Sequence, residues 1–396
     1  MKGALVICPA SPGRFDGVGD YSFWLARYLQ SHLPTFLVTT QKGGQKVSDG
    51  PRVPHLVLSQ TASAEGGWNQ LWRSRHVSPF LESDVVLLQY VPQMYVPTRD
   101  VGWLLLWLSY ARLRQGKKVI VTAHEYDIPW SLSMSRILAR VMLNLLMGAL
   151  GTLAEKVVVT YGHSQRKLSR LLFRRKKISI IPVGSNIPLS VVSEKGEATT
   201  DQEQRTLGNG QRTERHPRPT ILTIFGQPAG MDRRLLSSLG VWVLENRLPV
   251  RIQWIGRPRE DILDLWLSQC GLPLEFLEVY EGQPTEIVSW LLQASDLFLA
   301  PLVDGVSTRR TTVIAALGHG LPIVGTDGPC TDSQLRAAHA FLLSQCGDAE
   351  TFVKNVDLLF HDEPLRKLMR RAARDLFTRF FTWERIADEY WQLLRT

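Results

Sequence analysis

Two series of strand-like apolar runs, each alternating with helical patterns, constrain the fold of this 396-residue chain more than any other feature. The first series fills residues 1–188, and the second begins at residue 219. Short runs rich in Val, Ile and Leu that alternate with helical segments are typical of parallel sheets covered by helices on both faces. We therefore predict an α/β chain with two similar halves, each a doubly wound parallel sheet.

A polar segment separates the two series. Residues 189–218 are rich in charged and small polar residues and contain no aromatic residue. A segment of this composition cannot bury enough apolar surface to fold, so we expect a flexible linker. The expected domains are then 1–188 and 219–379, and the helical pattern of the tail predicts one or two terminal helices.

The chain is basic, with a formal net charge of +9 and a pI of about 9.5. An acidic partner is expected, either a phosphorylated small molecule or an anionic lipid, and no aromatic and basic pattern of a nucleic-acid module is present. The basic run at 164–177 suits lipid headgroups at the inner face of a membrane, a pyrophosphate-linked acceptor, or a plain solvated face. The sequence does not choose among these three interpretations.

Four cysteines are scattered singly, without the close pairs of a zinc site or a redox motif, so neither is expected. The chain starts almost at once on a strand-like run, without a signal-peptide pattern. The apolar stretches 101–113 and 137–154 are too short or too interrupted by polar residues to predict membrane spans. We expect a cytoplasmic protein.

Glycines follow the first expected strand. Gly17 and Gly19 lead into an amphipathic helix, and backbone amides at a helix start favour an anion. A dinucleotide site is disfavoured because the loop is too long and the second strand ends in Thr39 and Thr40 instead of an acidic residue. A tight turn without a ligand remains the alternative.

Two further candidates follow later strands. His124 ends the fourth expected strand, where an imidazole can donate a hydrogen bond to a ligand or shuttle a proton, although a structural role is the alternative. In the second half, Ser307 and Thr308 can cap a helix that Arg309 and Arg310 flank. This combination predicts a cationic pocket suited to a diphosphate, against the alternative of a capped helix with solvated arginines.

The ordered motifs "GVGDYS", "VTAHEYD", "IPVGSNIP", "DGVSTRRTTVIAALGHGLPIVGT" and "FTWERIADEYW" resemble glycosyltransferases of the GT-B fold, especially the family-four-like group. The resemblance implies two Rossmann-like domains facing across a cleft, with the acceptor in the first and a nucleotide-sugar in the second. It also implies that a C-terminal helix at about 380–396 crosses back to the first domain. Enzymes of this group need neither metal nor other cofactor and typically retain the anomeric configuration.

Matched onto this chain, the resemblance places His124 near the donor sugar and the backbone amides around Val306 to Arg309 at the phosphates. Donor contacts are expected from Gly17, Gly19, Gly226, Gln227, Arg233, Gly256, Arg257, Glu281, Asp304, Val306, Ser307 and Thr308. Acceptor contacts are expected from Asp20, Tyr21, Tyr90, Tyr126 and Arg166.

The chain departs from the family pattern at its charged positions. The paired glutamates of the family would fall on Ser307 and Ala315, and Gln227 stands where an arginine is usual. The charge of a leaving diphosphate must be stabilised by some other group. We expect Arg309 and Arg310 to supply it.

The sequence thus predicts a hexosyltransferase that moves a sugar from a nucleotide diphosphate donor, expected to be a UDP-sugar, to a hydroxyl group. The acceptor is a saccharide, a lipid-linked molecule or a natural product. One alternative is a degenerate GT-B protein that binds nucleotide or glycan as a partner or regulatory subunit. A GT-B epimerase is another alternative, and a phosphorylase is disfavoured because no motif for a pyridoxal-phosphate lysine is found.

Overall fold

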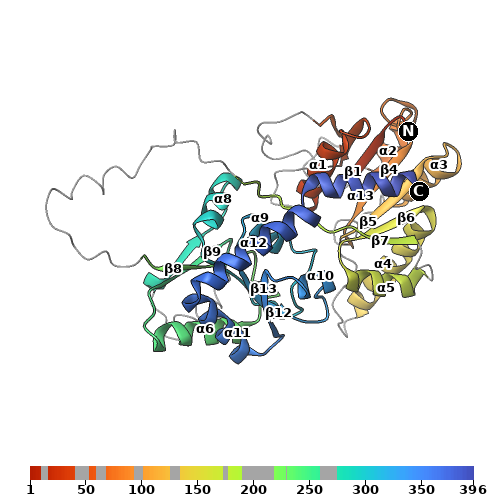
Figure 1. Ribbon diagram of the computed structural model, residues 1–396. Coiled ribbons are helices and arrows are strands. Elements are labelled where there is room, and N and C mark those ends of the chain that lie inside the picture. The colour runs from red at the N-terminus through yellow and green to blue at the C-terminus, as the bar shows by residue number, and fades with distance from the viewer. Residues whose placement is uncertain are drawn as a thin grey trace.

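The computed structural model describes residues 1–9, 17–40, 53–58, 68–92, 101–124, 134–172, 177–189, 218–228, 230–258 and 274–396. These residues form two parallel sheets, each sandwiched between helices (Figure 1). The predicted doubly wound α/β architecture is confirmed. The predicted linker, 189–218, lies outside the described residues except for its first and last residue.

The first sheet has seven strands in the order β3-β2-β1-β4-β5-β6-β7. Helices α2 to α5 bury apolar residues against one face, and α1 covers the other face. The strands are β1 (Ala4–Cys8), β2 (Thr35–Thr39), β3 (His55–Val57), β4 (Val85–Tyr90), β5 (Lys118–Ala123), β6 (Lys156–Val159) and β7 (Ile178–Ile180). The helices are α1 (Gly17–Leu29), α2 (Trp68–Arg73), α3 (Val101–Leu113), α4 (Met134–Leu153) and α5 (Gly162–Leu172).

The second sheet has six strands in the order β10-β9-β8-β11-β12-β13. Helices α6 and α11 cover one face, and α8, α9 and α12 cover the other. The strands are β8 (Thr220–Phe225), β9 (Val250–Ile255), β10 (Leu277–Tyr280), β11 (Leu297–Ala300), β12 (Ile323–Asp327) and β13 (Phe341–Gln345). The helices are α6 (Arg233–Glu245), α8 (Thr285–Ala294), α9 (Thr311–Gly318), α10 (Ser333–Arg336), α11 (Ala349–His361) and α12 (Glu363–Phe380).

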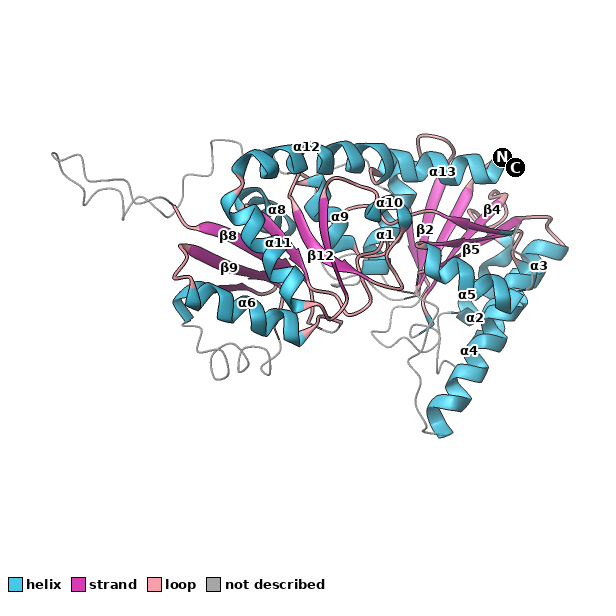
Figure 2. Ribbon diagram, turned by 60° about the horizontal axis from the view of Figure 1, so that its bottom comes forward, coloured by secondary structure: helices cyan, strands magenta, loops and turns pink. Residues whose placement is uncertain are grey.

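The C-terminal helix α13 (Trp383–Arg395) returns to the first domain, where it packs on α1 (Figures 1 and 2). Trp383 is buried and its indole N–H donates to the carbonyl oxygen of Ser185 at 2.8 Å. A Cβ atom at Gly184 would lie 2.6 Å from the Trp383 ring, so only glycine permits this packing. As a result, one continuous apolar core joins residues of both domains.

Hydrogen bonds at the domain junction add to this core. The backbone N–H of Thr308 donates to the Asp332 carboxylate at 2.8 Å, and the Thr308 hydroxyl donates to the carbonyl oxygen of Thr160 at 2.6 Å. The same carboxylate accepts the backbone N–H of Gly162 at the first turn of α5, also at 2.8 Å. Asp332 therefore stabilises an N-terminus of the first domain from within the second.

The three described cysteines, Cys8, Cys330 and Cys346, are not in disulfide bonds. Burial raises the pKa of the Cys330 thiol to about 11, so this group stays protonated at neutral pH. Within the described ranges, no helix combines the length and apolar character that crossing a bilayer requires.

Trp383→Ala should lower the free energy of unfolding by about 3–5 kcal/mol, because it opens a cavity in the shared core and leaves the Ser185 carbonyl without its donor. Urea unfolding followed by circular dichroism measures the change. Trp290→Ala is the matched control, since that side chain is 53% exposed and its loss should change stability by no more than about 0.5 kcal/mol. Equal effects of the two substitutions would contradict the anchoring role.

Candidate active site

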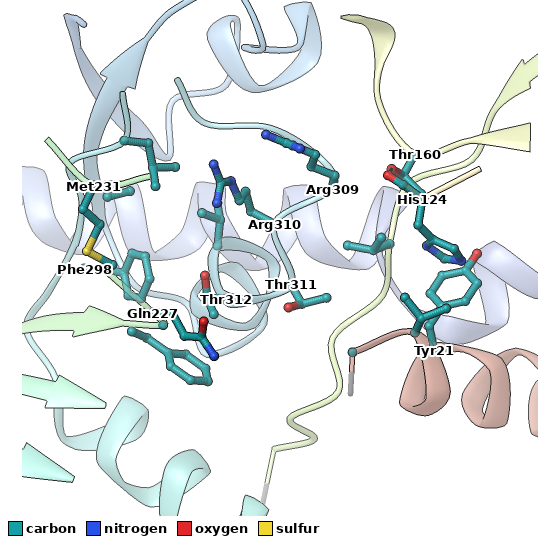
Figure 3. A pocket seen from close by; sticks show the side chains of 18 of the residues that line it. Tyr21, His124, Thr160, Gln227, Met231, Phe298, Arg309, Arg310, Thr311 and Thr312 are labelled. Atoms are coloured by element: carbon teal, nitrogen blue, oxygen red, sulfur yellow. Dashed lines mark hydrogen bonds between the residues drawn. The ribbon is translucent and has the colours of Figure 1, made fainter. Parts of the chain in front are cut away.

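A cavity of about 490 Å³ lies between the two domains, beyond the carboxyl ends of strands from both sheets. Figure 3 shows Tyr21, His124 and Thr160 of the first domain on one side, opposite side chains of the second domain. The residues lining the cavity are Gly17, Val18, Tyr21, Val91, His124, Thr160, Val183, Phe225, Gly226, Gln227, Met231, Phe298, Leu299, Ala300, Leu302, Arg309, Arg310, Thr311, Thr312 and Val313.

Two helix N-termini from opposite domains meet at this cavity. Gly17 and Val18 open α1, and Thr311 to Val313 open α9. The N-cap residue of α9, Arg310, makes no side-chain capping hydrogen bond. Backbone N–H groups and the helix dipole at such an end favour a negatively charged ligand.

Arg309 and Arg310 add positive charge at the start of α9. A guanidinium Nη2 of Arg309 lies 2.5 Å from Oδ2 of Asp304, and that of Arg310 lies 2.9 Å from Oδ1 of the same carboxylate. Arg309 also stacks over the ring of Tyr161 at 4.8 Å. Two guanidinium groups share one carboxylate, so the cluster keeps a formal charge of +1 beside the cavity.

This cluster retains hydrogen-bonding capacity as well as charge. The side chain of Arg310 is 26% exposed, and its buried Nε has no hydrogen-bond partner among the described residues. The hydroxyl groups of Thr311 and Thr312 also belong to the lining (Figure 3). Guanidinium and hydroxyl donors at a helix N-terminus are the groups that bind phosphate oxygens in pairs.

His124 is a neutral residue at this site. Its Nε2 lies 2.9 Å from Oε1 of Gln89, and since an amide oxygen can only accept, Nε2 carries the proton and Nδ1 is left as an acceptor. Burial lowers the pKa of His124 to about 3. The imidazole therefore cannot be a cationic acid at neutral pH, which argues against proton shuttling and leaves the hydrogen-bonding and the structural roles.

A buried polar network holds His124 from behind. The Tyr21 ring lies edge-on to the imidazole with centroids 4.6 Å apart, and its hydroxyl donates to the Tyr390 hydroxyl at 3.1 Å. Tyr390 in turn lies 2.8 Å from the hydroxyl of Thr122. Burial raises the pKa of Tyr390 to about 12, so both phenols stay protonated. The C-terminal helix thus supports the site through Tyr21.

Several expected donor positions are not in the lining of the cavity. Arg257 and Glu281 form an exposed ion pair 3.6 Å apart, and Arg233 is exposed at the start of α6. Gly256, at φ +118°, approaches the carbonyl oxygen of Gly226 so closely that a Cβ atom would lie 2.9 Å from it. Gly256 therefore shapes the loop behind Gly226 and is not part of the lining.

The donor contacts predicted at Val306, Ser307 and Thr308 do not coincide with the lining of this cavity. All three residues are buried, and none lines the cavity. The Thr308 hydroxyl is engaged at the domain junction, so α9 begins later, at Thr311, and that turn meets the cavity instead. Asp304 binds the two arginines and is likewise not a lining residue. Ala315, one of the two positions of the missing glutamates, is buried within α9.

Expected residues of the first domain divide in the same way. Gly17 and Tyr21 line the cavity, whereas Gly19 and Asp20 lie within the first turn of α1 and do not. Tyr90 is buried in the core, and Arg166 donates to the carbonyl oxygen of Pro329 outside the cavity. Tyr126 lies outside the described residues.

Apolar lining residues are the part of the site that the sequence analysis missed. Met231 and Phe298 lie with Gln227 on the side of the second domain (Figure 3), and Phe225 also lines the cavity. Phe225 ends β8 directly before Gly226, and Met231 precedes α6. For Phe225 and Met231 the end of β8 was the available signal, because ligands of parallel sheets collect there, whereas Phe298 lies within β11 (Leu297–Ala300) and carried no such signal.

The sequence matches no protein-family model and no curated protein. Solved structures are similar over almost the whole chain. Sucrose-phosphate synthase from Thermosynechococcus elongatus is 15% identical with a TM-score of 0.67, covering 100% of this chain and 98% of that one. HepE from Anabaena, in complex with UDP and glucose, is 14% identical with a TM-score of 0.66 over 100% of both chains.

A protein named for a different reaction, epimerisation, has the same architecture. A proposed UDP-N-acetylglucosamine 2-epimerase from Listeria monocytogenes is 13% identical with a TM-score of 0.56, covering 100% of this chain and 96% of that one. Together these likenesses show that the chain has the GT-B fold, as the resemblance predicted. Because one fold hosts several reactions, the activity has to be argued from the site.

The pH dependence of stability should report the burial of His124. The pKa of this group falls from about 6.5 in the unfolded chain to about 3 in the folded one, so its contribution is complete above pH 6.5 and is lost as the pH falls toward 3. Between pH 7 and pH 5, wild type should lose about 2 kcal/mol more unfolding free energy than His124→Gln.

Urea titrations of both proteins at the two pH values measure this difference. Burial also lowers the pKa of His55 and His319, but both residues are present in the two proteins and cancel. Parallel losses in wild type and His124→Gln would show that His124 titrates normally.

Proposed function

We propose that this protein is a nucleotide-sugar-dependent glycosyltransferase that transfers a hexose, with retention, from a UDP-sugar to an acceptor hydroxyl. The observation that carries the proposal is the meeting of two helix N-termini and two arginines at one cavity between GT-B domains. A diphosphate ester carries the charge that such a site attracts. HepE, whose solved complex contains UDP and glucose, supports uridine as the base.

The diphosphate is assigned to the second domain. Arg310 is the residue best able to bind phosphate oxygens. Its side chain is partly exposed, and its Nε has no hydrogen-bond partner within the described structure. Asp304 holds both guanidinium groups in place before the ligand arrives. Pre-organised charge of this kind stabilises a leaving group without further rearrangement. Arg309 and Arg310 therefore supply the positive charge that an arginine at the position of Gln227 would supply.

The sugar is assigned to the side of His124. In the transfer, the bond from the anomeric carbon to the diphosphate oxygen breaks, and a bond to the acceptor oxygen forms on the same face. The acceptor proton passes to the departing diphosphate oxygen, so no protein base is required. The neutral His124 then acts through Nδ1, which accepts a hydrogen bond from a sugar hydroxyl and orients the ring.

Removal of Arg310 should weaken UDP binding selectively. Arg310→Ala should raise the Kd for UDP by about 10- to 100-fold, as expected for the loss of charge-assisted hydrogen bonds. Isothermal titration calorimetry measures it. Arg371→Ala removes an exposed arginine from α12 and should leave the Kd unchanged. Absence of wild-type affinity for UDP, GDP, ADP and dTDP alike would overturn the donor proposal.

Replacement of His124 should affect turnover more than binding. His124→Phe should keep UDP affinity close to that of wild type but slow UDP release from UDP-glucose by about 10- to 100-fold, because the sugar loses an orienting hydrogen bond. The assay combines UDP-glucose with a panel of saccharide and lipid-linked acceptors, and mass spectrometry identifies the product. Binding of UDP-glucose without any glycosylated product would favour a binding protein, and an altered sugar still attached to UDP would favour an epimerase.

A further inference from the structure

Helix α4 presents an apolar stripe to the solvent. Its exposed side chains recur at the i, i+3, i+4 spacing of one helix face and are Met134, Ile137, Leu138, Val141, Met142 and Leu145, between 41% and 78% exposed. The opposite face, with Leu146, Met147 and Leu150, is buried in the core. In Figure 2, α4 projects from the body of the first domain. Packing therefore explains one apolar face of α4 and leaves the other unexplained.

Helix α3 extends this apolar surface. Trp103, Leu106 and Leu113 are 41%, 45% and 76% exposed. Both helices bury their inner faces on the same side of the seven-stranded sheet, so their outer faces point the same way. Nine of the 22 exposed large apolar side chains in the described structure lie on these two helices, and a concentration of this kind marks an interaction surface.

The three helices of this region carry charged residues of one sign. The sequences of α3, α4 and the neighbouring α5 contain six basic residues and no aspartate or glutamate. Arg112 of α3 is paired with Glu155, 2.7 Å away, but Arg170 is exposed on α5, and α5 packs beside α4 (Figures 1 and 2). An apolar stripe on one helix beside an exposed basic side chain on its neighbour is the pattern of helices that lie in a lipid interface.

We propose that the outer face of α3 and α4, defined by the nine exposed apolar residues named above, docks on an anionic lipid bilayer. The apolar stripe of α4 enters the boundary between headgroups and acyl chains, and the exposed Arg170 of α5 contacts acidic headgroups. A symmetric pair of chains joined through this face would bring two basic regions together, so lipid fits the charge better than a second copy. The proposal does not depend on the transferase assignment.

Vesicle flotation tests this proposal with the full-length chain. The wild-type protein should float with vesicles of phosphatidylcholine and phosphatidylglycerol and bind at least about tenfold less to phosphatidylcholine alone. Leu138→Gln/Leu145→Gln removes two side chains that are 61% and 69% exposed, and should reduce binding to the anionic vesicles at least about tenfold. If this variant loses its far-UV circular dichroism, Met134→Gln/Met142→Gln replaces it.

Leu358→Gln/Leu368→Gln is the matched control, because it removes two exposed leucines from α11 and α12 of the second domain. This control should bind vesicles as wild type does. Three results would overturn the proposal: no binding of wild type to anionic vesicles, equal losses in both double variants, or a dimer in sedimentation that Leu138→Gln/Leu145→Gln converts to monomer.

Discussion

The attachment of α13 to the first domain is the constraint on which the site depends. Helix α12 packs in the second domain, and Trp383 and Tyr390 bury α13 in the first, so the chain end fixes how the two sheets face each other. The loops beyond the strand ends then line one cavity. Tyr390 also contacts Tyr21, which lies against His124. Tyr390, near the end of the sequence, thereby supports His124, which directly follows β5.

The two domains contribute different electrostatics to that cavity. The second domain offers fixed positive charge, because Asp304 neutralises only one of the two guanidinium groups it binds. The first domain offers neutral polar groups, since burial keeps His124 uncharged. An unpaired charge is expensive to bury, so the cation sits at a partly exposed rim and the imidazole lies deeper. A ligand that spans the cavity therefore meets a charged end and an uncharged one.

The sequence predicted the layers of this fold because the spacing of apolar residues in a strand or helix is a local property. Gly17, Gly226 and His124 were also within reach, since a position after a strand is visible in the sequence. The start of α9 could not be predicted from the sequence. Thr308 is held at the domain junction by Thr160, a contact 148 residues away that no local pattern reveals, and this moves the helix start to Thr311. Likewise, apolar spacing alone could not reveal that α4 is exposed on one face.

The net charge of +9 suggested an acidic partner, and the structure places basic side chains in two separate regions. At the cavity, guanidinium groups are held by hydrogen bonds at a helix N-terminus, where surrounding protein weakens screening by salt. On α5, exposed basic side chains lie in water, where attraction to a partner falls within about 8–10 Å at physiological ionic strength. The first arrangement suits a small ligand bound at a defined distance. The second suits a broad surface whose apolar contact, through α4, has to supply most of the affinity.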